Sequence, residues 1–137
     1  MSKIKFRAWN KAKKCWELDE WVLSPNGKLL ELIHGTPIWV DEDSHVLSQF
    51  IGLKDCKRTK EYPEGKEIYE GDILQPKNRE EKYYVIEFKD GGFKRKYKVK
   101  MKYKGEEWIE TKYHENIFAD EHRVIGNIYE NPELLEV

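Results

Sequence analysis

Apolar and polar residues alternate with a period of two over many short stretches of the chain. Near the N-terminus Ile4, Phe6 and Ala8 alternate with charged residues, which is the pattern of a half-buried strand. Turn-forming residues follow at 10–14 and 24–27, so we expect residues 15–23 and 28–33 to form further antiparallel strands. Two more apolar runs, at 38–40 and 46–51, complete a predicted N-terminal β unit.

A charged segment interrupts this pattern. Residues 54–67 hold nine charged side chains together with Pro63 and Gly65, and almost nothing apolar. Such a composition is typical of a surface loop or linker. We therefore predict an N-terminal β unit over residues 1–55, a charged insertion over 56–64 and a C-terminal unit over 65–137.

The second half returns to short strands. The pattern predicts strands at 68–74, 83–88, 93–104, 107–113 and 124–129, with a hairpin turn signal at Asp90-Gly91-Gly92. Asn131 and Pro132 favour a short terminal helical turn. Several antiparallel strands in so short a segment suit a small barrel. The predicted fold class is mainly β, with a minor α contribution.

The most regular alternation lies in the strand after that hairpin turn. Apolar, aromatic and arginine side chains point one way, while lysines point the other way along about 33 Å. These lysines are Lys94, Lys96, Lys98, Lys100, Lys102 and Lys104. Their spacing resembles that of successive phosphates, and Trp108, Tyr83, Tyr84 and Tyr113 are close enough in sequence to supply stacking rings.

A second interpretation of the lysine row needs no ligand. Lysines on an edge strand prevent sheet-to-sheet aggregation, and Glu106, Glu107 and Glu110 on the following strand are available to pair with them. The net charge of −1 also differs from the basic balance of most nucleic-acid-binding modules.

Composition separates the chain from disordered proteins. Although 37% of the residues are charged, 13% are aromatic, a content that disordered chains lack. Charge alternates in blocks: residues 1–14 are basic, 15–53 acidic, 54–104 basic and 105–137 acidic. Blocks of this kind indicate strands that neutralise one another, or complementary surfaces on two subunits.

Several function classes receive no support from the sequence. No stretch reaches the ~18 apolar residues of a membrane span, and the N-terminus lacks a signal-peptide pattern, so we expect a cytoplasmic protein without membrane contact. Cys15, expected to be buried, and Cys56, expected in the charged loop, form no paired motif. The usual phosphate, zinc and nucleophile motifs are also missing.

Two groups of histidines and carboxylates are the candidate metal ligands. One includes His114, Glu115 and the run 120–122, and the other includes the acidic run 41–43 with His45. A metal needs several such groups converging on one point, which a single irregular segment seldom provides. We interpret both groups as solvated loops and predict no metal and no cofactor.

Four segments together resemble the YopX family. They are KFRAW at 5–9, QFIGLKD at 49–55, GKEIYEGDIL at 65–74 and VIGNIYENPELLE at 124–136. The resemblance implies a small protein encoded by a phage or prophage, with an SH3-like barrel in the C-terminal unit. It supplies no catalytic or ligand residue. The chain departs from the family pattern at Asn10, where Asp is usual, and in the insertion 56–64.

The leading hypothesis from the sequence is a non-catalytic binding module that meets nucleic acid or a host or phage protein. Its candidate surface consists of the six lysines and Trp108. The alternatives are a self-associating assembly protein, which would form a homo-oligomer, and an enzyme of unrecognised type.

Overall fold

Twelve β-strands dominate the computed structural model, which describes residues 5–17, 21–23, 28–33, 36–39 and 43–135. Within these residues the only helical elements are two 3-10 turns, η1 (Ala119–Glu121) and η2 (Pro132–Leu135). The mainly β prediction is therefore confirmed. None of the described helical turns is long or apolar enough to cross a membrane.

The chain divides into two units. An N-terminal unit comprises Phe6–Ser48, and a C-terminal unit comprises Met1–Lys5 together with Gln49–Val137. Strand β6 (His45–Lys54) begins in the first unit and ends in the second. The charged insertion 56–64 lies inside the C-terminal unit.

The N-terminal unit contains the expected hairpin. Strands β1 (Phe6–Asn10) and β2 (Cys15–Trp16) pair antiparallel, with Trp9 opposite Trp16. Asn10 ends β1 and shapes the turn, because its side-chain oxygen accepts a hydrogen bond from the Lys13 amide at 2.9 Å. Arg7 covers the Trp16 ring at 4.0 Å. A three-stranded sheet of β3 (Trp21–Leu23), β4 (Leu29–Ile33) and β5 (Thr36–Trp39) completes this unit.

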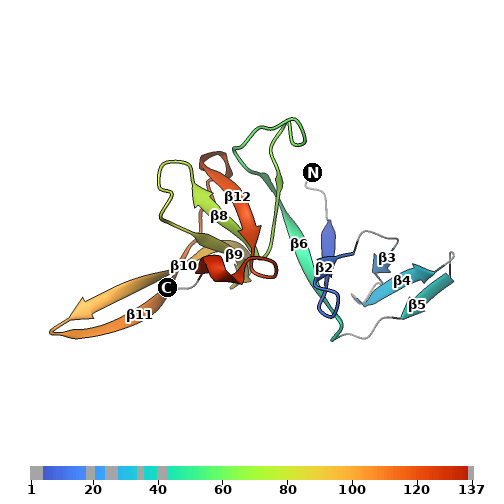
Figure 1. Cartoon of the computed structure of the whole chain (residues 1–137), viewed down its shortest axis with the longest axis horizontal. Coiled ribbons are helices and arrows are strands. Elements are labelled where there is room, and N and C mark those ends of the chain that lie inside the picture. The colour runs from blue at the N-terminus through green and yellow to red at the C-terminus, as the bar shows by residue number, and fades with distance from the viewer. Residues whose placement is uncertain (1–4, 18–20, 24–27, 34–35, 40–42, 136–137) are drawn as a thin grey trace. The chain divides into compact units, whose positions relative to one another are not determined.

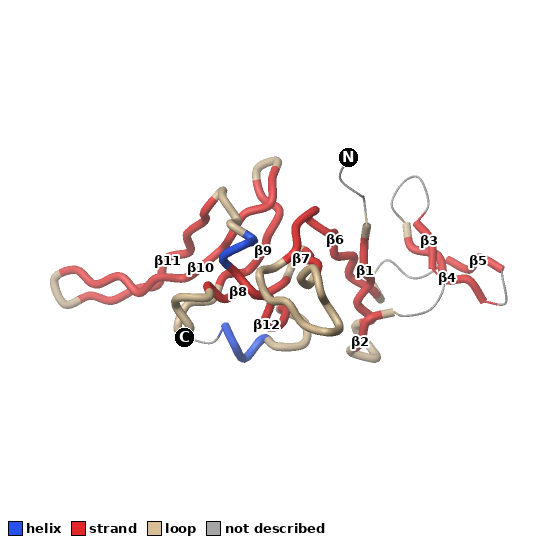
Figure 2. The backbone as a smooth tube through the Cα atoms, turned by 90° about the horizontal axis from the view of Figure 1, so that it is seen from above, coloured by secondary structure: helices blue, strands red, loops and turns tan. Residues whose placement is uncertain are grey.

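The C-terminal unit is built on a five-stranded antiparallel sheet in the order β11-β10-β9-β8-β12. Its strands are β8 (Asp72–Pro76), β9 (Tyr84–Lys89), β10 (Gly92–Tyr103), β11 (Glu106–His114) and β12 (His122–Asn127), and β7 (Glu67–Tyr69) pairs with the end of β6. The sheet curls into a half-barrel. Figure 2 shows β7, β8, β9 and β12 gathered together, with β10 and β11 running away from them.

The core of the C-terminal unit joins three of its strands. Ile68, Leu74, Tyr84 and Ile86 form a buried cluster that joins β7 to β8 and β9. The alternation in β9 explains its half of the cluster, because Tyr84 and Ile86 are buried whereas Val85 between them is only partly covered.

A buried carboxylate, Asp55, holds the two ends of the charged insertion together. Asp55 is 2% exposed, and its two side-chain oxygens accept hydrogen bonds from the amides of Lys66 at 2.8 Å and Val124 at 2.9 Å. One residue thus fastens both ends of the insertion to β12. Gly65 is required beside it, because its φ is +98° and a Cβ atom there would overlap the Asp55 carbonyl oxygen.

Candidate nucleic-acid interface

The longest hairpin of the chain projects from the C-terminal sheet. Strand β9 pairs with β10 only between Gly92 and Lys96, whereas β11 pairs with β10 from Arg95 to Tyr103. From Tyr97 onward β10 and β11 therefore form a two-stranded ribbon, which we call the β10–β11 ribbon. Figure 1 shows the ribbon extending from the rest of the C-terminal unit as a separate arm.

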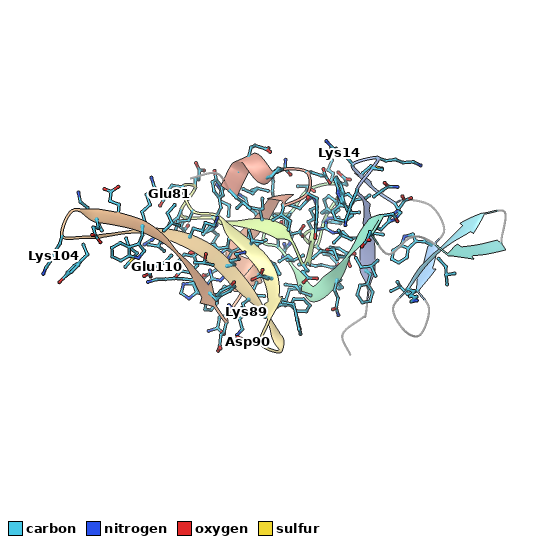
Figure 3. The ribbon with its side chains drawn as sticks, turned by 90° about the horizontal axis from the view of Figure 1, so that it is seen from below. Lys14, Glu81, Lys89, Asp90, Lys104 and Glu110 are labelled. Carbon is cyan, nitrogen blue, oxygen red and sulfur yellow. The ribbon has the colours of Figure 1, made fainter. Side chains whose placement is uncertain are left out.

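A two-residue turn sets the register of this ribbon. Lys104 and Gly105 have φ values of 49° and 82°, the left-handed pair of a type I′ turn whose twist matches that of the flanking strands. Strand β10 ends at Tyr103, so Lys104 lies in the turn and not in the strand. Figure 3 shows Lys104 at the tip of the ribbon, with Glu110 farther back along it.

Five of the six predicted lysines share one face of the ribbon, which we call the lysine face. The register places Lys96, Lys98, Lys100 and Lys102 of β10 opposite Tyr113, Thr111, Ile109 and Glu107 of β11, and Lys94 continues the row. The face therefore holds five lysines and a single glutamate from the two strands.

Ion pairs engage only some of these lysines. The closest nitrogen-to-oxygen distances are 3.8 Å for Lys94 and Glu115, 3.6 Å for Lys96 and Glu87, and 3.9 Å for Lys102 and Glu107. The Lys94 side chain is only 16% exposed, whereas the more solvated pairs of Lys96 and Lys102 contribute about 0–1 kcal/mol each. Lys98 and Lys100 are exposed and have no acidic partner among the described residues.

The three glutamates of β11 do not all pair with the lysine face. Glu107 alone lies on the lysine face, because Glu106 and Glu110 stand opposite Tyr103 and Val99 on the other side. The ribbon, residues 97–112, carries five lysines against three glutamates, which leaves +2.

Trp108 lies on the opposite face from the lysines. It pairs with Met101, is 41% exposed and donates a hydrogen bond from Nε1 to Glu110 Oε1 at 3.0 Å. The seven predicted residues thus do not form one surface. A signal for this arrangement was present in the Lys104-Gly105 turn, since a two-residue loop pairs residue 101 with residue 108.

A buried cation that the sequence pattern did not indicate anchors the base of the ribbon. Arg95 is 7% exposed, donates from Nε to the Asn116 carbonyl at 2.7 Å, and lies over the Tyr84 ring at 4.6 Å. Its Nη1 lies 3.0 Å from His122 Nε2. Because the other His122 nitrogen, Nδ1, lies 2.9 Å from the Phe118 carbonyl, the ring donates there and accepts from Arg95.

This arrangement holds His122 neutral. The ring is 3% exposed, and desolvation lowers its pKa below the ordinary value of 6.5, with the nearby Arg95 charge acting in the same direction. Both ring nitrogens are occupied by internal hydrogen bonds. His122 and Arg95 therefore fasten β10 to β12 at the point from which the ribbon extends.

The family model for YopX protein matches residues 5–136. The chain belongs to the YopX family. No curated protein matches the sequence.

The YopX segments of the C-terminal unit meet in space. Asp55 of the second segment bonds to Lys66 of the third and Val124 of the fourth, and the Gly71 carbonyl accepts from the Ile128 amide at 2.9 Å. These segments supply the framework, and the ribbon lies between the third and the fourth.

Asn10, which stands where the YopX pattern usually has Asp, hydrogen-bonds to a residue nearby in the sequence. Asn10 Nδ2 donates to Glu17 Oε1 at 2.8 Å, a hydrogen bond that an aspartate cannot give. This donation is the main reason why the pKa of Glu17 is lowered, and the His45 hydrogen bond adds to it.

The candidate metal ligands are dispersed where the structure describes them. His114 stacks on Tyr97 at 4.9 Å, His122 is buried against Arg95, and Asp120 and Glu121 are exposed. In the second group, residues 41 and 42 lie outside the described part of the chain. No cluster of three potential ligands occurs among the described residues.

One of the two cysteines differs from its expected environment. Cys15, predicted to be buried, is exposed, because β2 has only two residues and this one points to solvent. Cys56 lies in the charged loop as predicted and is half-buried there, because its amide donates to the His122 carbonyl at 2.8 Å and holds it against β12.

Proposed function

We propose that the chain is a non-catalytic accessory module of a phage or prophage, acting in the bacterial cytoplasm, that binds nucleic acid through the lysine face of the β10–β11 ribbon. The curled sheet of the C-terminal unit would then be the SH3-like barrel that presents the ribbon. The observation that carries the proposal is the row of lysines on one face, of which Lys98 and Lys100 are exposed and have no acidic partner among the described residues.

The electrostatics of that face favour a polyanionic ligand. Lys98 and Lys100 are free of acidic partners among the described residues, and Lys96 and Lys102 are held only by long, solvated ion pairs. Each contact between a lysine and a phosphate releases counterions from the nucleic acid, so the affinity falls as salt rises. About four such contacts give a slope of log affinity against log salt of about −3.6.

The non-catalytic part of the proposal is supported by the roles of the two buried side chains whose pKa values are shifted. Arg95 and His122 are the described side chains that combine burial with a shifted pKa. His122 uses both ring nitrogens in internal hydrogen bonds, and Arg95 donates to Asn116 and His122, which suits an anchoring role.

Fluorescence anisotropy with labelled oligonucleotides over a range of salt concentrations tests the proposal. The double variant Lys98→Gln/Lys100→Gln removes two phosphate contacts, so the salt slope should fall by about 1.8 and the affinity at 0.1 M salt by roughly 60-fold. The matched control is Lys57→Gln/Lys60→Gln, which removes the same charge from exposed positions of the insertion. Absence of binding at low salt, or equal losses in both variants, would refute the proposal.

The other face of the ribbon supports self-association as a second candidate function. Tyr103 is 64% exposed and Trp108 is 41% exposed on that face, and aromatic rings are enriched in protein interfaces. Light scattering at increasing concentration should then show a dimer that Trp108→Ala abolishes. A monomeric mass at every concentration would contradict this candidate.

A further inference from the structure

The row of lysines and the exposed aromatic rings lie on different faces of the ribbon, although Lys112 is on the aromatic face and the Lys104 ammonium lies 5.3 Å from the Tyr103 ring centroid. Tyr113 is the only ring on the lysine face between Gly92 and His114, and the Lys89 ammonium lies over it at 4.0 Å. The exposed rings, Tyr103 and Trp108, lie on the other face beside Glu106 and Glu110. Proteins that bind single strands need cations and rings on the same surface, because unpaired bases stack while phosphates are neutralised. The lysine face does not offer that combination.

The dimensions of the ribbon favour a duplex groove. Its two strands lie about 4.8 Å apart, and the major groove of B-form DNA, about 12 Å wide, admits a two-stranded ribbon. From Tyr97 to Tyr103 no other strand of the described part of the chain pairs with it, so about 20 Å of the ribbon has only two strands. The major groove of A-form RNA is too deep and narrow for such an insertion.

The chemistry of the ribbon selects phosphates over base edges. Arginine, asparagine and glutamine make the rigid bidentate contacts that distinguish bases, whereas lysine reaches guanine only as a point charge on a flexible stem. Between Gly92 and His114 the sequence contains no asparagine or glutamine, and its one arginine, Arg95, is buried against Asn116 and His122. The lysines that remain act as point charges.

We infer that the β10–β11 ribbon binds B-form double-stranded DNA along its major groove and does so independently of base sequence. This inference rests on the proposed nucleic-acid binding and specifies the form of the ligand.

Anisotropy with four labelled probes of equal length tests the inference on the full chain. The probes are two DNA duplexes of unrelated sequence, the RNA duplex of one of them, and its single DNA strand. The two DNA duplexes should bind equally well and more tightly than the RNA duplex and the single strand. Lys98→Gln/Lys100→Gln should weaken duplex binding, whereas Trp108→Ala should leave it unchanged.

The remaining outcomes distinguish a failure of the duplex inference from a failure of the proposed nucleic-acid binding. Tighter binding of the single strand, with roughly tenfold loss on Trp108→Ala, overturns the duplex assignment and leaves nucleic-acid binding standing. Equal binding of the RNA duplex overturns the groove assignment, and unequal binding of the two DNA duplexes overturns sequence independence. If no probe binds, the proposed function itself fails.

Discussion

Replacing Asp55 by alanine removes the buried acceptor that holds the charged insertion against β12. The amides of Lys66 and Val124 then lose their partner in a site that is 2% exposed. A hydrogen bond to a charged group contributes about 1.5–3 kcal/mol, so the loss of two should lower the free energy of unfolding by about 3–5 kcal/mol. This is a large share of the roughly 5–15 kcal/mol that stabilises a domain.

Asp55→Asn provides the graded comparison. Its side chain has the same shape but only one acceptor oxygen, so one of the two amides faces an NH₂ group and the expected loss is about 1.5–3 kcal/mol. The control is Asp120→Ala, which removes an exposed carboxylate and should change the free energy by less than about 0.5 kcal/mol.

Urea denaturation followed by circular dichroism measures these differences, and amide hydrogen exchange locates them. Protection of the Lys66 and Val124 amides should fall in Asp55→Asn while the amides of β9 stay protected. The assignment of Asp55 as a fastening residue is wrong if Asp55→Ala unfolds at the same urea concentration as Asp120→Ala, or if both amides keep their protection.

Two further predictions concern the same unit. Because burial lowers the pKa of His122, the stability it contributes is complete above about pH 6.5 and is lost as the pH falls toward the folded-state value. The melting temperature should thus fall more steeply below pH 6.5 in the wild type than in His122→Gln, and parallel curves would contradict the neutral ring. Gly65→Ala should lower the free energy of unfolding by about 2–4 kcal/mol, through a positive φ and overlap with Asp55. Gly91→Ala has a similar φ but open space around its Cβ, so urea denaturation should show a loss of only about 1–2 kcal/mol there.

The features that were predictable from the sequence are local in origin. Alternation identified β10 and the side of the strand on which its lysines lie, because the period of two depends only on the extended backbone. The Asp90-Gly91 turn and the terminal turn at Pro132 were recognisable for the same reason, since each depends on the conformational preference of one or two residues. The mainly β class follows from the sum of such signals.

The features that the sequence did not reveal depend on distant partners. Asp55 looked like one more charge in a charged loop, and it is buried only because Val124, 69 residues later, supplies an amide. Arg95 looked like part of the cationic strand, yet alternation turns it away from the lysines and toward His122 on β12. Trp108 was assigned to the lysine surface by proximity in sequence, whereas the register of the turn places it on the other face.

The near-zero net charge of the chain argued against a nucleic-acid ligand, but the geometry of the ribbon weakens that objection. Charges on a solvated surface are screened beyond a Debye length of about 10 Å at 0.1 M salt. The ribbon continues for about 20 Å past its last pair with β9, so Lys100, Lys102 and Lys104 lie beyond the screening distance of the acidic residues of β8, β9 and β12. A phosphate approaching the ribbon responds to its local charge of +2, which already includes the three glutamates of β11, and the total of −1 governs only the behaviour of the chain at a distance.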